Sequence, residues 1–187
     1  MTDPEFQLRV LESAVGELEN YLLSPEVFWR VSGAADLPNL TLGGLELSRR
    51  ELAAASDELD PAARQRAQTV IEQIDEFRRQ SRLAWERKAA SELKVRVNQW
   101  QTYLQDLAEL PDESERYPQE VRVRAMATYL LEEAAHQPQA DETLKRLAAL
   151  DARLRVSFAS GGFIWDPSLA EAYPAGTHWF LYGRPKT

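Results

Sequence analysis

The sequence contains no cysteine and only two histidines, His136 and His178, among its 187 residues. Without cysteine the chain can form no disulfide, can hold no metal through thiolates and can use no cysteine nucleophile. Two histidines also exclude metal sites that need several imidazole ligands. The composition therefore removes several classes of enzyme, and we expect no bound cofactor or metal.

Glycine is scarce and unevenly distributed. Seven of the eight glycines lie in two windows, Gly33–Gly44 and Gly161–Gly183, and none lies between Leu45 and Ser160. That span contains only four prolines, at positions 61, 111, 118 and 138. Because glycine and proline are the strongest breakers of regular structure, the span is predicted to consist of helices interrupted at the prolines.

The chain also lacks a long apolar run and an excess of basic residues. No stretch approaches the roughly 18 apolar residues that a membrane helix requires. The first ten residues, MTDPEFQLRV, have no basic segment and no apolar core, so we expect no secretory signal. The 30 acidic and 22 basic side chains give a net charge of -8, which argues against a general nucleic-acid coat. We expect a cytoplasmic protein with a single domain over residues 1–187.

Capping residues and apolar spacing predict where the helices lie. Asp3-Pro4 and Asp60-Pro61 each place a good N-cap before a proline at the first helical position, where proline has no backbone N–H to lose. Apolar residues at spacings of three and four then extend the helices. The predicted helices cover about residues 4–23, 49–59, 62–110, 118–136 and 141–156, with a short helix after Pro25.

The stretch 62–110 contains neither proline nor glycine, and its apolar residues change phase between Trp85 and Leu93. Two interpretations stay open: one long helix with a stutter, or two helices that meet near residues 86–92. In both cases the predicted fold is all-α, an elongated antiparallel helical bundle with long, partly coiled-coil-like helices. Its parts are the N-terminal helices (1–59, with a loop over 32–47), a long-helix core (60–157) and an aromatic-rich C-terminal segment (158–187).

The sequence LTLGGLEL, Leu40–Leu47, places leucines on both sides of Gly43-Gly44. Alternating leucines around a two-glycine turn predict a small β-hairpin near residues 40–47. The alternative is an extended loop whose leucines seal one end of the bundle. We favour the loop because an isolated hairpin is only marginally stable, although the β-prone stretch Thr177–Tyr182 could supply a further strand.

Two groups of side chains have the spacing of partial metal sites. Glu133 and His136 share one helix face, as in carboxylate-bridged di-iron bundles. Such sites need a second motif of this kind, so we expect His136 instead to interact with the dipole at the end of its helix. Glu72, Asp75 and Glu76 could line a helix face as ligands of Mg²⁺, but interleaved arginines favour a solvated face with ion pairs.

Charges of opposite sign concentrate in two stretches. Residues 78–96 carry seven cations against two glutamates, whereas residues 1–26 carry six carboxylates against one arginine. We expect these stretches to pair as neighbouring helices or across a dimer. The alternative is a basic patch for RNA, DNA or an acidic partner, flanked by Trp85 and Trp100. The candidate patch residues are Arg78, Arg79, Arg82, Arg87, Lys88, Lys94 and Arg96.

Aromatic residues concentrate near the C-terminus, where seven of the seventeen fall within residues 158–182. A disordered tail would be poor in aromatic residues, so this segment is predicted to fold onto another surface. It either closes one end of its own bundle, which we favour, or docks a partner, since Trp and Tyr dominate binding hot spots. The candidate partner-binding residues are Phe163, Trp165, Tyr173, Trp179, Phe180 and Tyr182.

No complete catalytic set is visible, since the chain has neither a G-x-S-x-G motif nor a glycine-rich phosphate loop. We therefore expect a non-enzymatic helical interaction protein: an adaptor, an assembly factor or a small subunit of a larger complex. Its partner would be another protein or a second copy of itself. One alternative is a nucleic-acid-associated accessory subunit that uses residues 78–96. The other is a helical-bundle metal-dependent enzyme that uses Glu133 and His136 or the group around Glu72.

Replacing His136 tests the metal hypothesis. The variant His136→Ala is expected to leave the metal content unchanged, because a lone Glu-x-x-His pair cannot assemble a two-metal site. The free energy of unfolding should fall by at most about 1 kcal/mol through the lost helix-end interaction. Elemental analysis of protein purified without chelator measures the first quantity, and chemical denaturation measures the second. Stoichiometric iron or manganese that is present in the wild type and lost in the variant would contradict the prediction.

Overall fold

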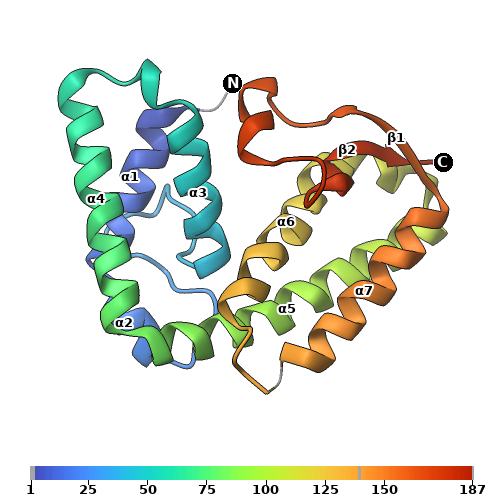
Figure 1. Cartoon of the computed structure of the whole chain (residues 1–187), viewed down its shortest axis with the longest axis horizontal. Coiled ribbons are helices and arrows are strands. Elements are labelled where there is room, and N and C mark those ends of the chain that lie inside the picture. The colour runs from blue at the N-terminus through green and yellow to red at the C-terminus, as the bar shows by residue number, and fades with distance from the viewer. Residues whose placement is uncertain (1–2, 139, 187) are drawn as a thin grey trace.

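Helices dominate the computed structural model, which describes residues 3–138 and 140–186 (Figure 1). Within these residues lie seven α-helices, four short 3-10 helices and one two-stranded antiparallel sheet, so the predicted all-α fold is confirmed. The α-helices are α1 (Pro4–Val15), α2 (Leu18–Leu23), α3 (Leu42–Ala54), α4 (Pro61–Gln80), α5 (Arg82–Glu109), α6 (Tyr117–Glu133) and α7 (Ala140–Val156). The strands are β1 (Phe158–Phe163) and β2 (Tyr182–Pro185), and the 3-10 helices are Ser56–Glu58, Pro111–Arg116, Pro167–Ala172 and Trp179–Leu181.

The helices form two groups that meet at α3 and α6 (Figure 1). In the first group α1 packs against both α3 and α4, and in the second group α5 packs against both α6 and α7. Helix α3 also contacts α5 and α6, so it lies at the junction of the two groups. The C-terminal segment contacts α3 and α6 and covers that side of the junction.

The stretch 62–110 forms two helices, which meet at Ser81. This residue has φ −107° and ψ 26°, outside the helical region. The break lies before residues 86–92 because Trp85 already belongs to the buried stripe of α5, with Ala89 and Leu93. The two-helix interpretation is correct, and its predicted meeting point is corrected to Ser81.

Three boundaries in the N-terminal part also differ from the prediction. The helix predicted over 4–23 is divided at Gly16, where the low helix propensity of glycine separates α1 from α2. No helix follows Pro25; instead Trp29 and Leu40 exchange backbone hydrogen bonds of 3.0 and 2.8 Å in an isolated bridge. The helix predicted over 49–59 begins earlier and corresponds to α3.

The segment Leu40–Leu47 is neither a hairpin nor a loop, because α3 begins inside it at Leu42. The side chain of Thr41 caps the helix by accepting a hydrogen bond of 3.0 Å from the backbone N–H of Gly44. The fully buried carboxylate of Glu92 in α5 accepts the backbone N–H groups of Leu42 and Gly43 at 2.7 and 3.2 Å. A carboxylate at a helix N-terminus satisfies unpaired donors and interacts favourably with the helix dipole, which stabilises helix over hairpin here.

Gly43 allows α3 to approach α5 and α6 closely. A Cβ atom at this position would lie 2.8 Å from Met126 Cβ and 2.9 Å from Glu92 Oε1, which is too close for ordinary packing. Gly43 therefore permits close packing between helices, whereas the sequence pattern had predicted a tight turn at this position.

The sheet lies at the C-terminal end of the chain, where β1 and β2 pair with an irregularity between Ser160 and Phe163. Ser160 is opposite Gly183, whose φ of 142° and close approach to Ala159 exclude a side chain. The predicted hairpin near residues 40–47 is thus wrong in its location. Of the β-prone stretch Thr177–Tyr182 only the last residue enters a strand, because residues 179–181 form a 3-10 turn.

The aromatic C-terminal segment packs against its own bundle. Tyr173 and Phe180 are fully buried. The indole N–H of Trp165 donates a hydrogen bond of 2.7 Å to the backbone carbonyl of Pro118 in α6. The hydroxyl of Tyr117, also in α6, donates a hydrogen bond of 2.7 Å to the carbonyl of Phe180. These contacts agree with the interpretation in which the segment closes one end of the bundle.

Replacing Glu92 tests its role in holding α3. The variant Glu92→Gln leaves the buried guanidinium of Arg96, which Glu92 Oε1 binds at 3.0 Å, without its counter-charge. Breaking a buried ion pair in this way is expected to lower the free energy of unfolding by about 3 kcal/mol, as measured by urea denaturation. The matched control Glu109→Gln, on the exposed end of the same helix, should change it by less than about 0.5 kcal/mol. Equal effects of the two substitutions would contradict the assignment.

Candidate functional site

A concavity lined by several charged side chains lies where α3, α4, α5 and α6 meet. Two adjoining cavities of about 170 and 270 Å³ share Arg78, Trp85, Glu132 and Glu133 in their walls. We call them together the arginine–glutamate cleft. Its other polar and aromatic lining residues are Glu46, Arg49, Arg50, Arg79, Arg82, Glu86, Tyr129 and His136.

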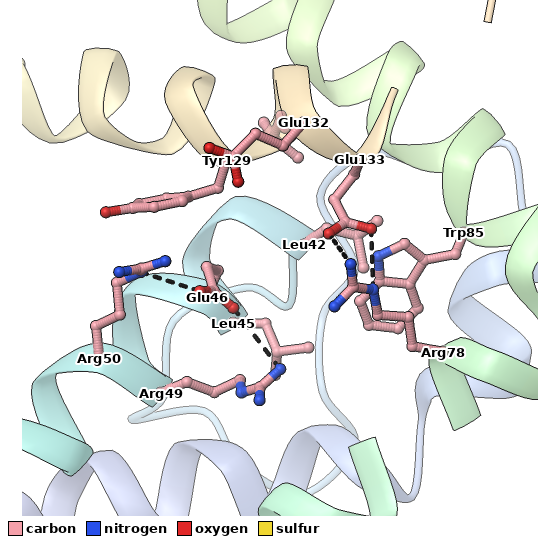
Figure 2. A pocket seen from close by; sticks show the side chains of 11 residues that line it. Leu42, Leu45, Glu46, Arg49, Arg50, Arg78, Trp85, Tyr129, Glu132 and Glu133 are labelled. Atoms are coloured by element: carbon pink, nitrogen blue, oxygen red, sulfur yellow. Dashed lines mark hydrogen bonds and ion pairs between the residues drawn. The ribbon is translucent and has the colours of Figure 1, made fainter. Parts of the chain in front are cut away.

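Helix α3 contributes one wall of the arginine–glutamate cleft. Figure 2 shows Glu46, Arg49 and Arg50 projecting from it, with Tyr129 of α6 opposite. Arg50 is held by Glu46 at 3.0 Å and lies 3.9 Å from the centre of the Tyr129 ring. Arg49 reaches Asp75 of α4 at 3.0 Å. The cation–π contact and the ion pairs fix both guanidinium groups in place without burying them completely.

The opposite wall is built on an ion pair between α4 and α6. Arg78 Nε donates to Glu133 Oε2 at 3.0 Å, and a second guanidinium nitrogen contacts Glu133 Oε1 (Figure 2). Such two-point contacts fix direction as well as distance. Burial raises the pKa of Glu133 above its ordinary value, and Arg78 opposes that shift by stabilising the carboxylate.

Trp85 forms the floor between the two cavities, and only 5% of its surface is exposed. Its indole N–H donates no hydrogen bond to any residue in 3–138 or 140–186, although the ring lies beside Arg78 and Glu133 (Figure 2). The Trp85 N–H is not one of the buried unpartnered polar atoms of the described residues, which are Trp100 Nε1 and Tyr173 Oη, so it is accessible from the cleft. Trp85 therefore presents an available donor to whatever enters the cleft.

Tyr129 connects the arginine–glutamate cleft to a buried histidine. Its hydroxyl lies 2.7 Å from His178 Nε2, and Thr177 Oγ1 lies 2.9 Å from His178 Nδ1. A neutral imidazole has one donor and one acceptor nitrogen, which suits two hydroxyl partners. Burial, together with the charge of Arg50, lowers the pKa of His178 from 6.5 to about 4. The residue is therefore neutral at physiological pH and serves to hold Tyr129.

The candidate basic patch is divided among different environments. Lys88 and Arg96 are buried; Lys88 donates to the carbonyls of Ser24 and Glu26 at 2.7 and 2.9 Å, and burial lowers its pKa. Arg87 and Lys94 are exposed on α5 and form no ion pair with residues 3–138 or 140–186. The remaining three members, Arg78, Arg79 and Arg82, line the arginine–glutamate cleft.

The residues of the two partial metal motifs also form contacts with other side chains instead of with each other. Glu133 of the Glu-x-x-His pair binds Arg78, and His136 is exposed at the rim of the arginine–glutamate cleft. Asp75 pairs with Arg49 and Glu76 with Arg79. In the part of the chain that the structure describes, no three carboxylate or imidazole side chains form a group that could hold a metal ion.

The acidic N-terminal stretch finds its partners in α4 and not in residues 78–96. Arg66 of α4 contacts Glu12 at 3.2 Å and Glu5 at 3.7 Å. Glu17 accepts hydrogen bonds from Trp29 and Ser32, which lower its pKa. Lys88 of the basic stretch meets residues 1–26 at the carbonyls of Ser24 and Glu26, at Ser24 Oγ and over the Tyr21 ring, and among the described residues no side-chain ion pair joins the two stretches. The expected pairing of the two stretches by side-chain charge is therefore not what joins these helices.

The aromatic candidates are unequally accessible. Tyr173 and Phe180 are fully buried, whereas Phe163, Trp165, Trp179 and Tyr182 are partly exposed but pack against the core. The partner-binding role of these residues stays a prediction. In the structure they belong to the segment that covers α3 and α6.

Sequence reasoning missed the α3 wall of the cleft. Arg49, Arg50 and Glu46 belong to a helix that was predicted to begin only at residue 49, so their common face was not recognised. The signal was present in their spacing, since Glu46 and Arg50 are four residues apart and face each other on a helix. Tyr129 carried no sequence signal that distinguishes it from a core residue.

Comparisons with protein-family models, with curated proteins and with solved structures find no match for this chain. Among the described helices, none has the length and apolar character needed to cross a membrane.

The depressed pKa of His178 predicts a pH dependence of stability. In the unfolded chain the imidazole binds a proton with a pKa near 6.5, whereas the folded protein resists protonation until about pH 4. The unfolded state therefore binds more protons in this window, and the free energy of unfolding should fall as the pH falls from 6.5 to 4. Urea denaturation at pH 7.5 and pH 5 measures the difference.

Two variants isolate the contribution of His178. His178→Asn removes the titrating group and should reduce the loss of stability between pH 7.5 and pH 5. His136→Asn changes the exposed histidine and should retain the wild-type loss. A His178→Asn protein with the same pH dependence as the wild type would show that folding does not lower the pKa of His178.

Proposed function

We propose that this chain is a cytoplasmic, non-enzymatic helical interaction protein that binds an acidic segment of a partner protein in the arginine–glutamate cleft. The observation that carries the proposal is the composition of that cleft. Arginine, tryptophan and tyrosine are the residues most enriched in binding hot spots, and Arg50, Arg78, Trp85 and Tyr129 all line it. The floor is apolar and the rim is polar, as in protein–protein interfaces.

The exposure of the ion pairs favours an acidic partner. In the pair of Arg78 and Glu133 the side chains are 45% and 23% exposed, and in the pair of Arg82 and Glu86 they are 68% and 9% exposed. In both pairs the arginine faces the solvent and the glutamate lies behind it. These two guanidinium groups face the solvent on a protein whose net charge is -8, which would orient an acidic segment toward this side of the cleft.

The available N–H of Trp85 adds a directional contact. A backbone carbonyl or a carboxylate of the bound segment would satisfy this donor, which has no acceptor within the described chain. Burying the indole further and filling the apolar floor formed by Leu42, Leu45 and Leu130 would add to the affinity. A polypeptide segment offers carbonyl, carboxylate and apolar groups together.

Affinity purification from the native host tests the proposal, with the nucleic acid of the lysate digested beforehand. The variants Arg82→Ala and Trp85→Phe should each reduce recovery of the partner at least about tenfold, because hot-spot truncations cost about 2 kcal/mol or more. Arg87→Ala is the matched control, since Arg87 is exposed on the same helix but lies outside the cleft. Recovery should fall as the salt concentration rises, because the rim charges are exposed.

Two results would count against a protein partner in this cleft. The first is a partner that all three variants recover as well as the wild type does. The second is recovery that disappears after nuclease digestion, which would favour the nucleic-acid alternative instead.

A further inference from the structure

A second cavity, of about 370 Å³, lies on another face of α3 and is mainly apolar. It is enclosed by α1, by residues 28–41, and by α3, α5 and α6. Pockets for small molecules occupy about 300–1,000 Å³ and are lined mostly by apolar side chains with few polar groups. We call it the apolar cavity; its apolar walls include Phe6, Val10, Ala14, Phe28, Val31 and Met126.

The charges that reach the apolar cavity have one sign. Arg96 and Arg122 both belong to its lining, whereas the carboxylates that bind them do not. Arg96 is bound by Glu92 at 3.0 Å and Arg122 by Glu51 at 2.8 Å. Glu92 and Glu51 are not part of the lining, so the charged side chains that line the cavity are both arginines.

Ser48 is a polar side chain of this wall that lacks a partner. The residue is only 8% exposed, it lines the apolar cavity, and its hydroxyl forms no hydrogen bond with residues 3–138 or 140–186. It lies on α3 between Thr41, which binds Arg96 at 3.0 Å, and Glu51, which binds Arg122. In the described residues the buried side-chain polar atoms without a partner are Trp100 Nε1 and Tyr173 Oη, so the Ser48 hydroxyl is not one of them and is accessible to a ligand group in the cavity that it lines.

We infer that the apolar cavity binds a small apolar carboxylic acid. The carboxylate would accept hydrogen bonds from the Ser48 hydroxyl and from the guanidinium groups on this wall, which are charge-assisted donors. The hydrocarbon part would lie against Phe6, Val10 and Val31. This site is separate from the arginine–glutamate cleft, and the inference does not depend on the function proposed for that cleft.

Isothermal titration calorimetry of the full chain with octanoate and 1-octanol tests the inference. The two probes share an apolar chain, and only octanoate carries a charge. Octanoate is expected to bind at one site at least tenfold more tightly than 1-octanol. Ser48→Ala should weaken octanoate binding about three- to tenfold, the effect of one hydrogen bond. Val10→Trp, which fills the cavity, should weaken it more than tenfold.

Matched controls are available on exposed surfaces. Ser91→Ala removes an exposed hydroxyl of α5, and Val156→Trp adds an indole at a position that is 86% exposed. Both should bind octanoate as the wild type does. If Val10→Trp fails to fold, Ser48→Ala decides, since it removes a single oxygen. Absence of octanoate binding, equal affinity for both probes, or wild-type affinity in the folded cavity variants would overturn the inference.

Discussion

The buried carboxylate of Glu92 is the interaction on which the arrangement of this protein depends. It binds the first backbone N–H groups of α3 and the guanidinium of Arg96 at the same time, and so joins α3 to α5. A fully buried carboxylate is stable only when it is paired and hydrogen-bonded, and here both conditions are met. The direction of α3 follows from this contact, since its N-terminus must meet Glu92.

Helix α3 in turn separates the arginine–glutamate cleft from the apolar cavity. Glu46, Arg49 and Arg50 face the arginine–glutamate cleft, and Ser48 faces the apolar cavity. Leu45 lines both the arginine–glutamate cleft and the apolar cavity, so its side chain forms part of the wall between them. A displacement of α3 would change both cavities together, because packed interiors transmit shifts instead of absorbing them.

Charge in this protein acts mainly between its own helices. The cations that look like one basic patch in the sequence are used for different contacts: Lys88 binds carbonyls next to α2, Arg96 binds Glu92, and Arg78 joins α4 to α6. Among the charged groups that stay accessible to a partner are the solvent-facing members of a few ion pairs. In the pairs Arg78–Glu133 and Arg82–Glu86 the arginine is the more exposed member, whereas in the pair Arg49–Asp75 the carboxylate is.

Sequence by itself determined the helical class and several helix ends, and it favoured a closing role for the aromatic segment over a docking role. The glycine-free middle span and the Asp-Pro starts at Pro4 and Pro61 were sufficient for this, because capping and propensity are local properties. The high aromatic content of residues 158–182 indicated correctly that this segment packs on the bundle, since exposed aromatic side chains are costly in water.

Only the tertiary structure decided where α3 begins and which charges meet. In LTLGGLEL the local pattern favours a hairpin or a loop, and a carboxylate fifty positions along the chain reverses that preference. The arginine–glutamate cleft likewise joins side chains of four helices, and no spacing within one helix encodes such a meeting. Contacts between distant residues form only when the helices pack, so the contacts of Glu92 with the start of α3 and of Arg78 with Glu133 could not be read from the sequence.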